Sequence, residues 1–130
     1  MISIVVPTYN ESENIREFFK KIKKLNLKNY EVIVIDDSTD DTAKIAKKEI
    51  KRLKIAGKII KRHNERGKGS AIREGLRNSK GDYIVLIDAD LQYPLEEIPS
   101  LIEKLNYFDI VNTNRIRRDR FCRKILSHIF

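Results

Sequence analysis

Two kinds of apolar pattern alternate along the chain. Nearly continuous apolar runs occupy residues 2–6, 32–35 and 83–87, and a shorter pair lies at 59–60. Such runs are typical of parallel strands buried on both faces, because neither face is left for polar side chains. Elsewhere, apolar residues recur every three or four positions, which is the spacing of one helix face. The chain is therefore predicted to alternate strands with amphipathic helices.

Four helices are predicted from the periodic segments. Their inward residues are, in chain order, Ile15, Phe18, Phe19, Ile22 and Leu25; Ala46, Ile50 and Leu53; Ala71, Ile72 and Leu76; and Ile98, Leu101, Ile102 and Leu105. Asn10 with Glu13 has the spacing of a capping box for the first helix. Ser38 with Asp41 can cap the second helix. Gly81 is expected to end the third.

The order of these elements predicts the fold class. Strictly alternating strands and helices require parallel strands joined by right-handed crossovers. The expected fold is α/β, a three-layer α/β/α sandwich with a mostly parallel sheet. Residues 109–111 are expected to add a fifth strand. We expect residues 1–115 to form one domain and residues 116–130 a basic amphipathic C-terminal helix of the same unit.

Composition narrows the class of protein. The 130 residues suit one domain, and 41% hydrophobic with 35% charged residues argues against a disordered chain. No run approaches the roughly 18–20 apolar residues of a membrane-spanning helix. The single cysteine, Cys122, allows no internal disulfide, which favours a cytoplasmic location. The net charge of +8 favours anionic partners but does not choose among nucleic acid, lipid headgroups and phosphorylated metabolites.

Two acidic clusters follow predicted strands. Asp36 and Asp37 end the second strand, and Asp88 and Asp90 follow the fourth. Parallel sheets bind ligands at the carboxyl ends of their strands, near the point where strand order reverses. Two carboxylates on alternate residues can face one hard cation, Mg²⁺ or Mn²⁺, with Gln92 as a third oxygen ligand. The alternative is that Asp88 caps a turn and that Asp90 is solvated.

Four motifs in fixed order carry a family resemblance. Residues 7–11 read Pro-Thr-Tyr-Asn-Glu, 36–40 read Asp-Asp-Ser-Thr-Asp, 64–69 read Asn-Glu-Arg-Gly-Lys-Gly, and 88–92 read Asp-Ala-Asp-Leu-Gln. This combination resembles the family-two glycosyltransferases of the GT-A fold, a Rossmann-like nucleotide-diphospho-sugar transferase type. The similarity is strongest to the synthases that move mannose or glucose onto dolichyl or polyprenyl phosphate. It covers the chain through Arg115, mainly the N-terminal nucleotide-binding half of such an enzyme.

The resemblance implies roles for individual residues. Pro7, Tyr9 and Glu11 would line the nucleoside pocket, and Asp37 would contact the base or ribose. For Tyr9 the alternative is a half-buried loop tyrosine. We rank Asp37 above Asp36, for which a structural role is the alternative.

Cationic and metal-binding residues would hold the diphosphate. Glycines beside Arg66 and Lys68 let the backbone approach a ligand, and a helix starting near there would favour an anion. A solvated basic loop is the alternative for both. By resemblance, Asp88 and Ala89 would contact the nucleotide sugar, and Asp88, Asp90 and Gln92 would hold Mg²⁺ or Mn²⁺. Asp90 and Arg115 would serve catalysis, unless Arg115 is a surface arginine.

The implied reaction transfers a hexose, with inversion, from a UDP- or GDP-linked sugar to an acceptor, with polyprenyl phosphate expected. A phosphate acceptor is already ionised and needs no strong general base. The chain is expected to be shorter than a whole enzyme of this kind. Alternatives are a non-catalytic nucleotide-binding or regulatory protein and, less favoured, a basic nucleic-acid-binding domain. Peripheral membrane contact through the basic tail, homo-oligomerisation and pairing with a partner chain stay open.

Overall fold

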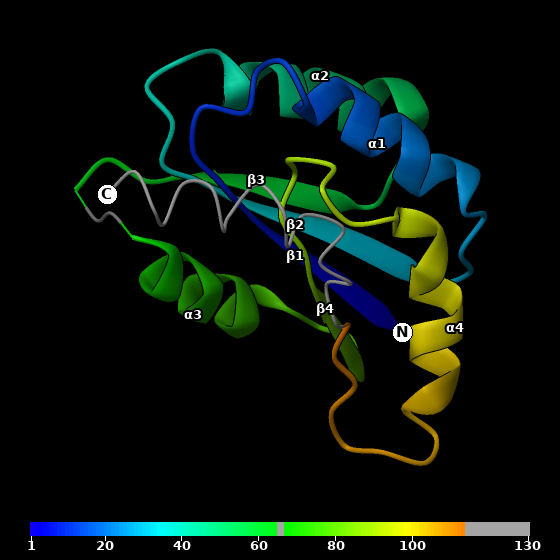
Figure 1. The fold of residues 1–130 in the computed structure, drawn as a ribbon. Coiled ribbons are helices and arrows are strands. Elements are labelled where there is room, and N and C mark those ends of the chain that lie inside the picture. The colour runs from blue at the N-terminus through cyan, green and yellow to red at the C-terminus, as the bar shows by residue number, and fades with distance from the viewer. Residues whose placement is uncertain (65–66, 114–130) are drawn as a thin grey trace, which may run out of the picture.

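The computed structural model describes residues 1–64 and 67–113, in which strands and helices alternate (Figure 1). The elements are β1 (Ile2–Thr8), α1 (Ile15–Lys24), β2 (Tyr30–Asp36), α2 (Thr42–Leu53), β3 (Gly57–Lys61), α3 (Lys68–Asn78), β4 (Tyr83–Leu86), the 3-10 turn η1 (Leu95–Glu97) and α4 (Ile98–Lys104). The predicted α/β class is confirmed.

The described strands form one sheet in the order β3-β2-β1-β4, and every neighbouring pair is parallel. The chain moves outward from β1 to β2 and β3, then returns across the sheet to place β4 on the other side of β1. Right-handed crossovers that run in opposite directions place their helices on opposite faces. The strand order therefore reverses between β1 and β4.

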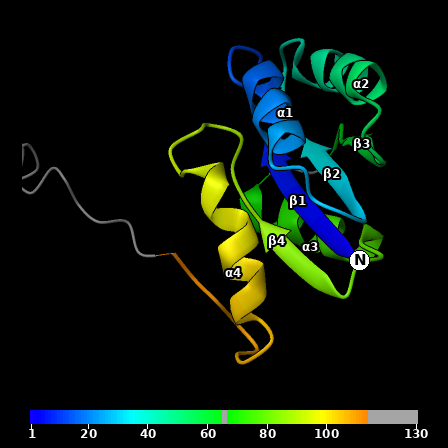
Figure 2. The same cartoon turned by 90° about the vertical axis from the view of Figure 1, so that its right-hand side faces the viewer.

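Helices cover both faces of the sheet, as Figures 1 and 2 show. Inward residues of α1 and α4, such as Phe18 and Ile98, share one buried cluster with Ile4 and Val34 of the sheet. On the opposite face Ala71 of α3 packs against Ile33 and Ile35. Alternate residues of β2 and β3 enter opposite clusters, which explains why these strands read as continuous apolar runs.

Two predicted helix caps are wrong. The N-cap of α1 is Asn14 and makes no side-chain capping bond, so Asn10 and Glu13 form no capping box. Residue Asp41 is the N-cap of α2 but likewise makes no side-chain cap bond; instead Asp40 accepts the Thr42 amide at 3.0 Å.

The predicted fifth strand is absent from the described residues, because 109–111 pair with no strand. Ile110 is 85% exposed, so this short apolar run has no packed surface to hold it in place. The third helix ends at Asn78, before Gly81. A Cβ at Gly81 would lie 2.6 Å from the Ser3 amide nitrogen, so this glycine serves a close approach of two backbones.

The boundary at residue 115 and the predicted helix over 116–130 lie outside the described residues. Among the residues that the structure describes, no helix is both long enough and apolar enough to span a bilayer.

The close packing of α3 on the sheet predicts opposite effects for two glycines. A Cβ at Gly75 would lie 2.2 Å from Cγ1 of the buried Val5, whereas a Cβ at Gly69 meets nothing within 4 Å. Replacing Gly75 with Ala should lower the free energy of unfolding by about 1–3 kcal/mol through overpacking. Replacing Gly69 with Ala in the same helix should leave it unchanged or raise it by up to about 1 kcal/mol. Urea unfolding measures both, and equal effects would contradict the packing described.

Candidate functional site

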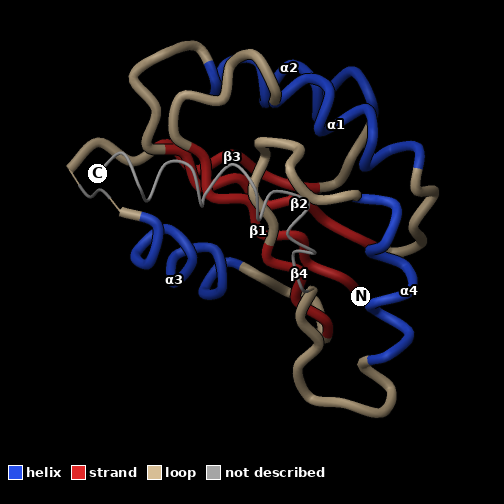
Figure 3. The backbone as a smooth tube through the Cα atoms, viewed as in Figure 1, coloured by secondary structure: helices blue, strands red, loops and turns tan. Residues whose placement is uncertain are grey.

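The carboxyl ends of all four described strands meet at one edge of the sheet, where the loops that follow them gather (Figure 3). The reversal of strand order falls between β1 and β4 at this edge. Residues from the first, second and fourth predicted motifs therefore converge here, as the sequence pattern indicated.

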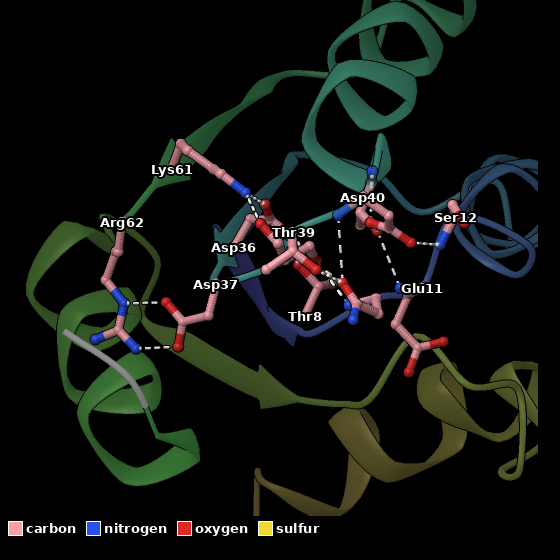
Figure 4. Close-up of polar contacts among 12 residues, drawn as sticks. Thr8, Glu11, Ser12, Asp36, Asp37, Thr39, Asp40, Lys61 and Arg62 are labelled. Carbon is pink, nitrogen blue, oxygen red and sulfur yellow. Dashed lines mark hydrogen bonds and ion pairs between the residues drawn. The ribbon is translucent and has the colours of Figure 1, made fainter. Parts of the chain in front are cut away.

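A buried carboxylate joins the first three strand ends. Asp36 is fully buried and accepts hydrogen bonds from Thr8 Oγ1 at 2.6 Å, Ser38 Oγ at 2.5 Å and Lys61 Nζ at 2.7 Å (Figure 4). These partners belong to β1, to the loop after β2 and to β3. The charge of Asp36 is therefore satisfied inside the protein, which is consistent with the structural role given above as its alternative.

Asp37 forms a bidentate ion pair with Arg62. Arg62 Nε donates to Asp37 Oδ1 at 2.7 Å and Nη2 donates to Oδ2, and each side chain is only 8% exposed (Figure 4). Arg62 also donates to the Gly67 carbonyl at 3.2 Å and to Ser70 Oγ at 2.9 Å. Asp37 thus presents a fixed, charge-balanced carboxylate at the edge.

Sequence reasoning missed Arg62 and Lys61. The register of the sheet pairs Asp36 with Lys61, so the next residues along, Asp37 and Arg62, also lie opposite each other. Only the alignment of β2 against β3 shows this correspondence between two acidic and two basic residues. A predicted register would have been the signal that identifies both pairs.

Hydrogen bonds tie the loop after β1 to the loop after β2. Asn10, at a φ of 53°, accepts the Thr39 amide through Oδ1 at 2.9 Å, and its own amide donates to Ser38 Oγ at 2.8 Å. Asp40 accepts the Ser12 amide at 3.4 Å, and the Glu11 amide donates to Thr42 Oγ1 at 2.9 Å. The two loops form one connected wall of the site.

The predicted nucleoside-pocket residues lie along β1 and the loop that follows it. Tyr9 is 57% exposed, so its ring is accessible for stacking. Glu11 Oε2 accepts a hydrogen bond from Asn14 Nδ2 at 2.9 Å. Pro7 lines a hollow of about 840 Å³ that runs beside β4 between α3 and α4, and Lys68 and Asp88 line the same hollow.

The acidic turn after β4 combines one buried and two accessible residues. Ala89 is buried in the core, so its side chain is closed to a ligand. Asp88 on one side is 34% exposed and pairs with Lys68 Nζ at 2.6 Å. Asp90 on the other side accepts the Gln92 amide at 3.1 Å, and Leu91 between them has a φ of 59°.

This turn supplies oxygen ligands of the kind that Mg²⁺ and Mn²⁺ prefer. Within residues 1–64 and 67–113, no three His, Cys, Asp or Glu side chains are grouped as a metal site. A cation at Asp88 and Asp90 would therefore take further ligands from Gln92, water or phosphate oxygens. The predicted residues Arg66 and Arg115 lie outside the described residues.

The chain belongs to glycosyl transferase family 2, whose model matches residues 3–129. A dolichol-phosphate mannosyltransferase from Pyrococcus furiosus is 39% identical over 134 residues, covering 97% of this chain and 38% of that protein. An undecaprenyl-phosphate 4-deoxy-4-formamido-L-arabinose transferase from Edwardsiella ictaluri is 37% identical over 126 residues, covering 92% of this chain and 38% of that protein. The family prediction is confirmed.

The fold is similar to that of a mannosyltransferase from Pyrobaculum calidifontis, solved in complex with GDP-Man and Mn²⁺. The TM-score is 0.79 at 26% sequence identity, over 96% of this chain and 38% of that one. This similarity confirms the predicted GT-A type of the α/β fold. The chain spans about 38% of the length of each of these three proteins.

The hydrogen bonds to Asp40 predict a pH effect on stability. Partial desolvation raises the pKa of Asp40, but hydrogen bonds from Thr42 and Ser12 outweigh it and hold the pKa below its ordinary value of 3.8. A carboxyl with a lowered folded-state pKa contributes stability above its unfolded-state pKa and loses it as pH falls through the folded-state pKa.

The stability advantage of the wild type over an Asp40→Asn variant should therefore be largest above about pH 5 and shrink below about pH 4. Urea unfolding of both proteins across this range measures it. A constant difference between them would show that the Asp40 charge does not stabilise the two loops.

Proposed function

We propose that the chain binds a nucleoside-diphosphate sugar, together with Mg²⁺ or Mn²⁺, at the carboxyl edge of its sheet. The observation that carries this proposal is the pairing of Asp88, after β4, with Lys68, at the start of α3. A carboxylate for a cation and an ammonium group for phosphate thus line one hollow together.

The nucleoside would occupy the wall built by the loops after β1 and β2. The accessible Tyr9 ring offers a stacking surface, and the fixed Asp37 carboxylate offers an acceptor for base or ribose donors. Pro7 and Glu11 would border the same pocket. The hydrogen bonds between these loops hold the wall in place before ligand binds, which lowers the ordering cost of binding.

The diphosphate would lie toward α3 and the turn after β4. Lys68 is the first residue of α3, and the amide groups at a helix start favour anions. Arg66 and the Ala89 backbone would complete the contacts. Asp88, Asp90 and Gln92 would hold the cation, which neutralises charge on the departing diphosphate.

We infer hexose transfer with inversion to a polyprenyl phosphate as the reaction that this donor site serves. Two similar proteins are named for dolichol-phosphate and undecaprenyl-phosphate transfer, which supports this acceptor class. The acceptor phosphate is ionised near neutrality and attacks without a strong base. Asp90 and Arg115 would stabilise the developing charge. Such an acceptor would place the reaction at a membrane surface. We propose that this surface is the cytoplasmic face of the membrane.

Calorimetric titration tests donor binding directly. UDP, GDP, UDP-glucose and GDP-mannose are titrated with and without Mn²⁺ into the wild type and into Asp88→Asn and Asp90→Asn variants. We expect the nucleotides of one base, uridine or guanosine, to bind in a Mn²⁺-dependent manner. Each variant should bind them at least about tenfold more weakly, a loss of about 1.4 kcal/mol in binding free energy.

The matched control is Glu103→Gln, because Glu103 is an exposed carboxylate in the last turn of α4 and does not line the hollow. It should bind as the wild type does. Binding that is independent of Mn²⁺, or equally weakened by all three substitutions, would refute the proposed site.

A further inference from the structure

Arg62 contacts three residues in two parts of the site, although no sequence motif contains it. It lies one residue beyond β3 and reaches Asp37 after β2, the Gly67 carbonyl and the Ser70 hydroxyl. Gly67 is the N-cap of α3 and Ser70 lies in the first turn of that helix. One guanidinium group therefore joins the end of β2 to the start of α3.

The geometry of these contacts needs an arginine. Arg62 binds Asp37 through one edge of the guanidinium group, using Nε and Nη2. The third nitrogen, Nη1, donates to Ser70 Oγ. A lysine ammonium could not make a planar bidentate contact while also reaching α3. With 8% of the side chain exposed, Arg62 is held away from most of the solvent.

The connection continues to the metal-binding turn. Ser70 Oγ donates to the Gly67 carbonyl at 3.0 Å. Lys68, the residue after Gly67, donates through Nζ to Asp88 Oδ2 at 2.6 Å. A continuous set of contacts thus crosses the site from Asp37 to Asp88. Its two ends are the residues assigned to the nucleoside and to the metal and diphosphate.

We propose that Arg62 is a positioning residue that couples the nucleoside end of the donor site to its diphosphate end. The inference rests on the proposed function but assigns a role to a residue outside the predicted ligand set. Arg62 acts through Asp37, whose carboxylate it orients, and through α3, whose first turn it anchors so that Lys68 faces Asp88. Each end is positioned by the same group.

An Arg62→Lys variant tests the inference through a ligand that lacks a base. The wild type and the variant are titrated, with Mn²⁺, with the nucleoside diphosphate that binds and with inorganic pyrophosphate. If Arg62 positions only Asp37, pyrophosphate binding should not change. We expect both ligands to bind about tenfold more weakly, because α3 loses its anchor as well.

Two further variants separate positioning from general destabilisation. Arg77→Lys, at an exposed arginine in the last turn of α3, is the matched control and should bind as the wild type does. Ser70→Ala keeps the Arg62 contacts to Asp37 and to the Gly67 carbonyl but removes the contact to the Ser70 hydroxyl, and should weaken pyrophosphate binding by about threefold. Urea unfolding of each variant, at the temperature of the titrations, shows that the protein measured is folded.

A double-mutant cycle provides a readout that a purely structural role would not change. Asp37→Asn and Lys68→Ala should affect nucleoside-diphosphate affinity non-additively, with the combined loss differing by more than about threefold from the product of the single losses. In the Arg62→Lys background the losses should simply multiply.

Each outcome bears on the inference in a defined way. Unchanged pyrophosphate binding by both Arg62→Lys and Ser70→Ala, or non-additivity that persists in the Arg62→Lys background, would overturn the coupling role alone. Absence of any nucleotide binding by the wild type would overturn the proposed function and this inference together. The wild-type titration therefore distinguishes the two failures.

Discussion

The buried carboxylate of Asp36 is the interaction on which the site depends. Burying a charge without partners is costly, and Asp36 meets this cost with two hydroxyl donors and one ammonium group. Because these donors come from β1, β3 and the loop after β2, the charge can be satisfied only when the three strand ends are in register. The loops that follow therefore leave the sheet from fixed positions.

Two further ion pairs lie at the same edge of the sheet, and they differ in how far their side chains are exposed to solvent. The pair of Asp37 and Arg62 is almost closed to solvent, with each side chain 8% exposed. The pair of Lys68 and Asp88 is open, at 62% and 34%. An open pair exchanges its partners at little cost, because water and ions can replace them. The closed pair fits a fixed position for the Asp37 carboxylate, and the open pair fits a place where a cation and a phosphate enter.

Much of the fold could be predicted because it follows from local patterns. The strands leave apolar runs in the sequence, and amphipathic helices leave a periodic stripe, so the parallel α/β sheet was predictable. The capping of α1 was not, since Asn10 is held by Thr39 from another loop rather than by its own helix. The predicted fifth strand was wrong because two apolar residues, Ile110 and Val111, do not show whether a neighbouring strand or helix is there for them to pack against.

The candidate site also contains some residues that the sequence predicts and others that it does not. Tyr9, Asp37 and the turn from Asp88 to Gln92 were found because they follow strands directly. Lys61 and Arg62 were missed because their partners lie 25 residues away in the sequence, across a register that no local pattern encodes.

The central claim, a metal-dependent donor site at the carboxyl edge, is tested most directly by nuclear magnetic resonance of the ¹⁵N-labelled chain with Mn²⁺ and the bound nucleoside diphosphate. Paramagnetic broadening should be strongest at the amides of Asp88 to Gln92 and of Lys68, and should spare Glu31 and Lys80 at the opposite edge. Broadening centred on the opposite edge, or spread evenly over the acidic surface, would contradict the account.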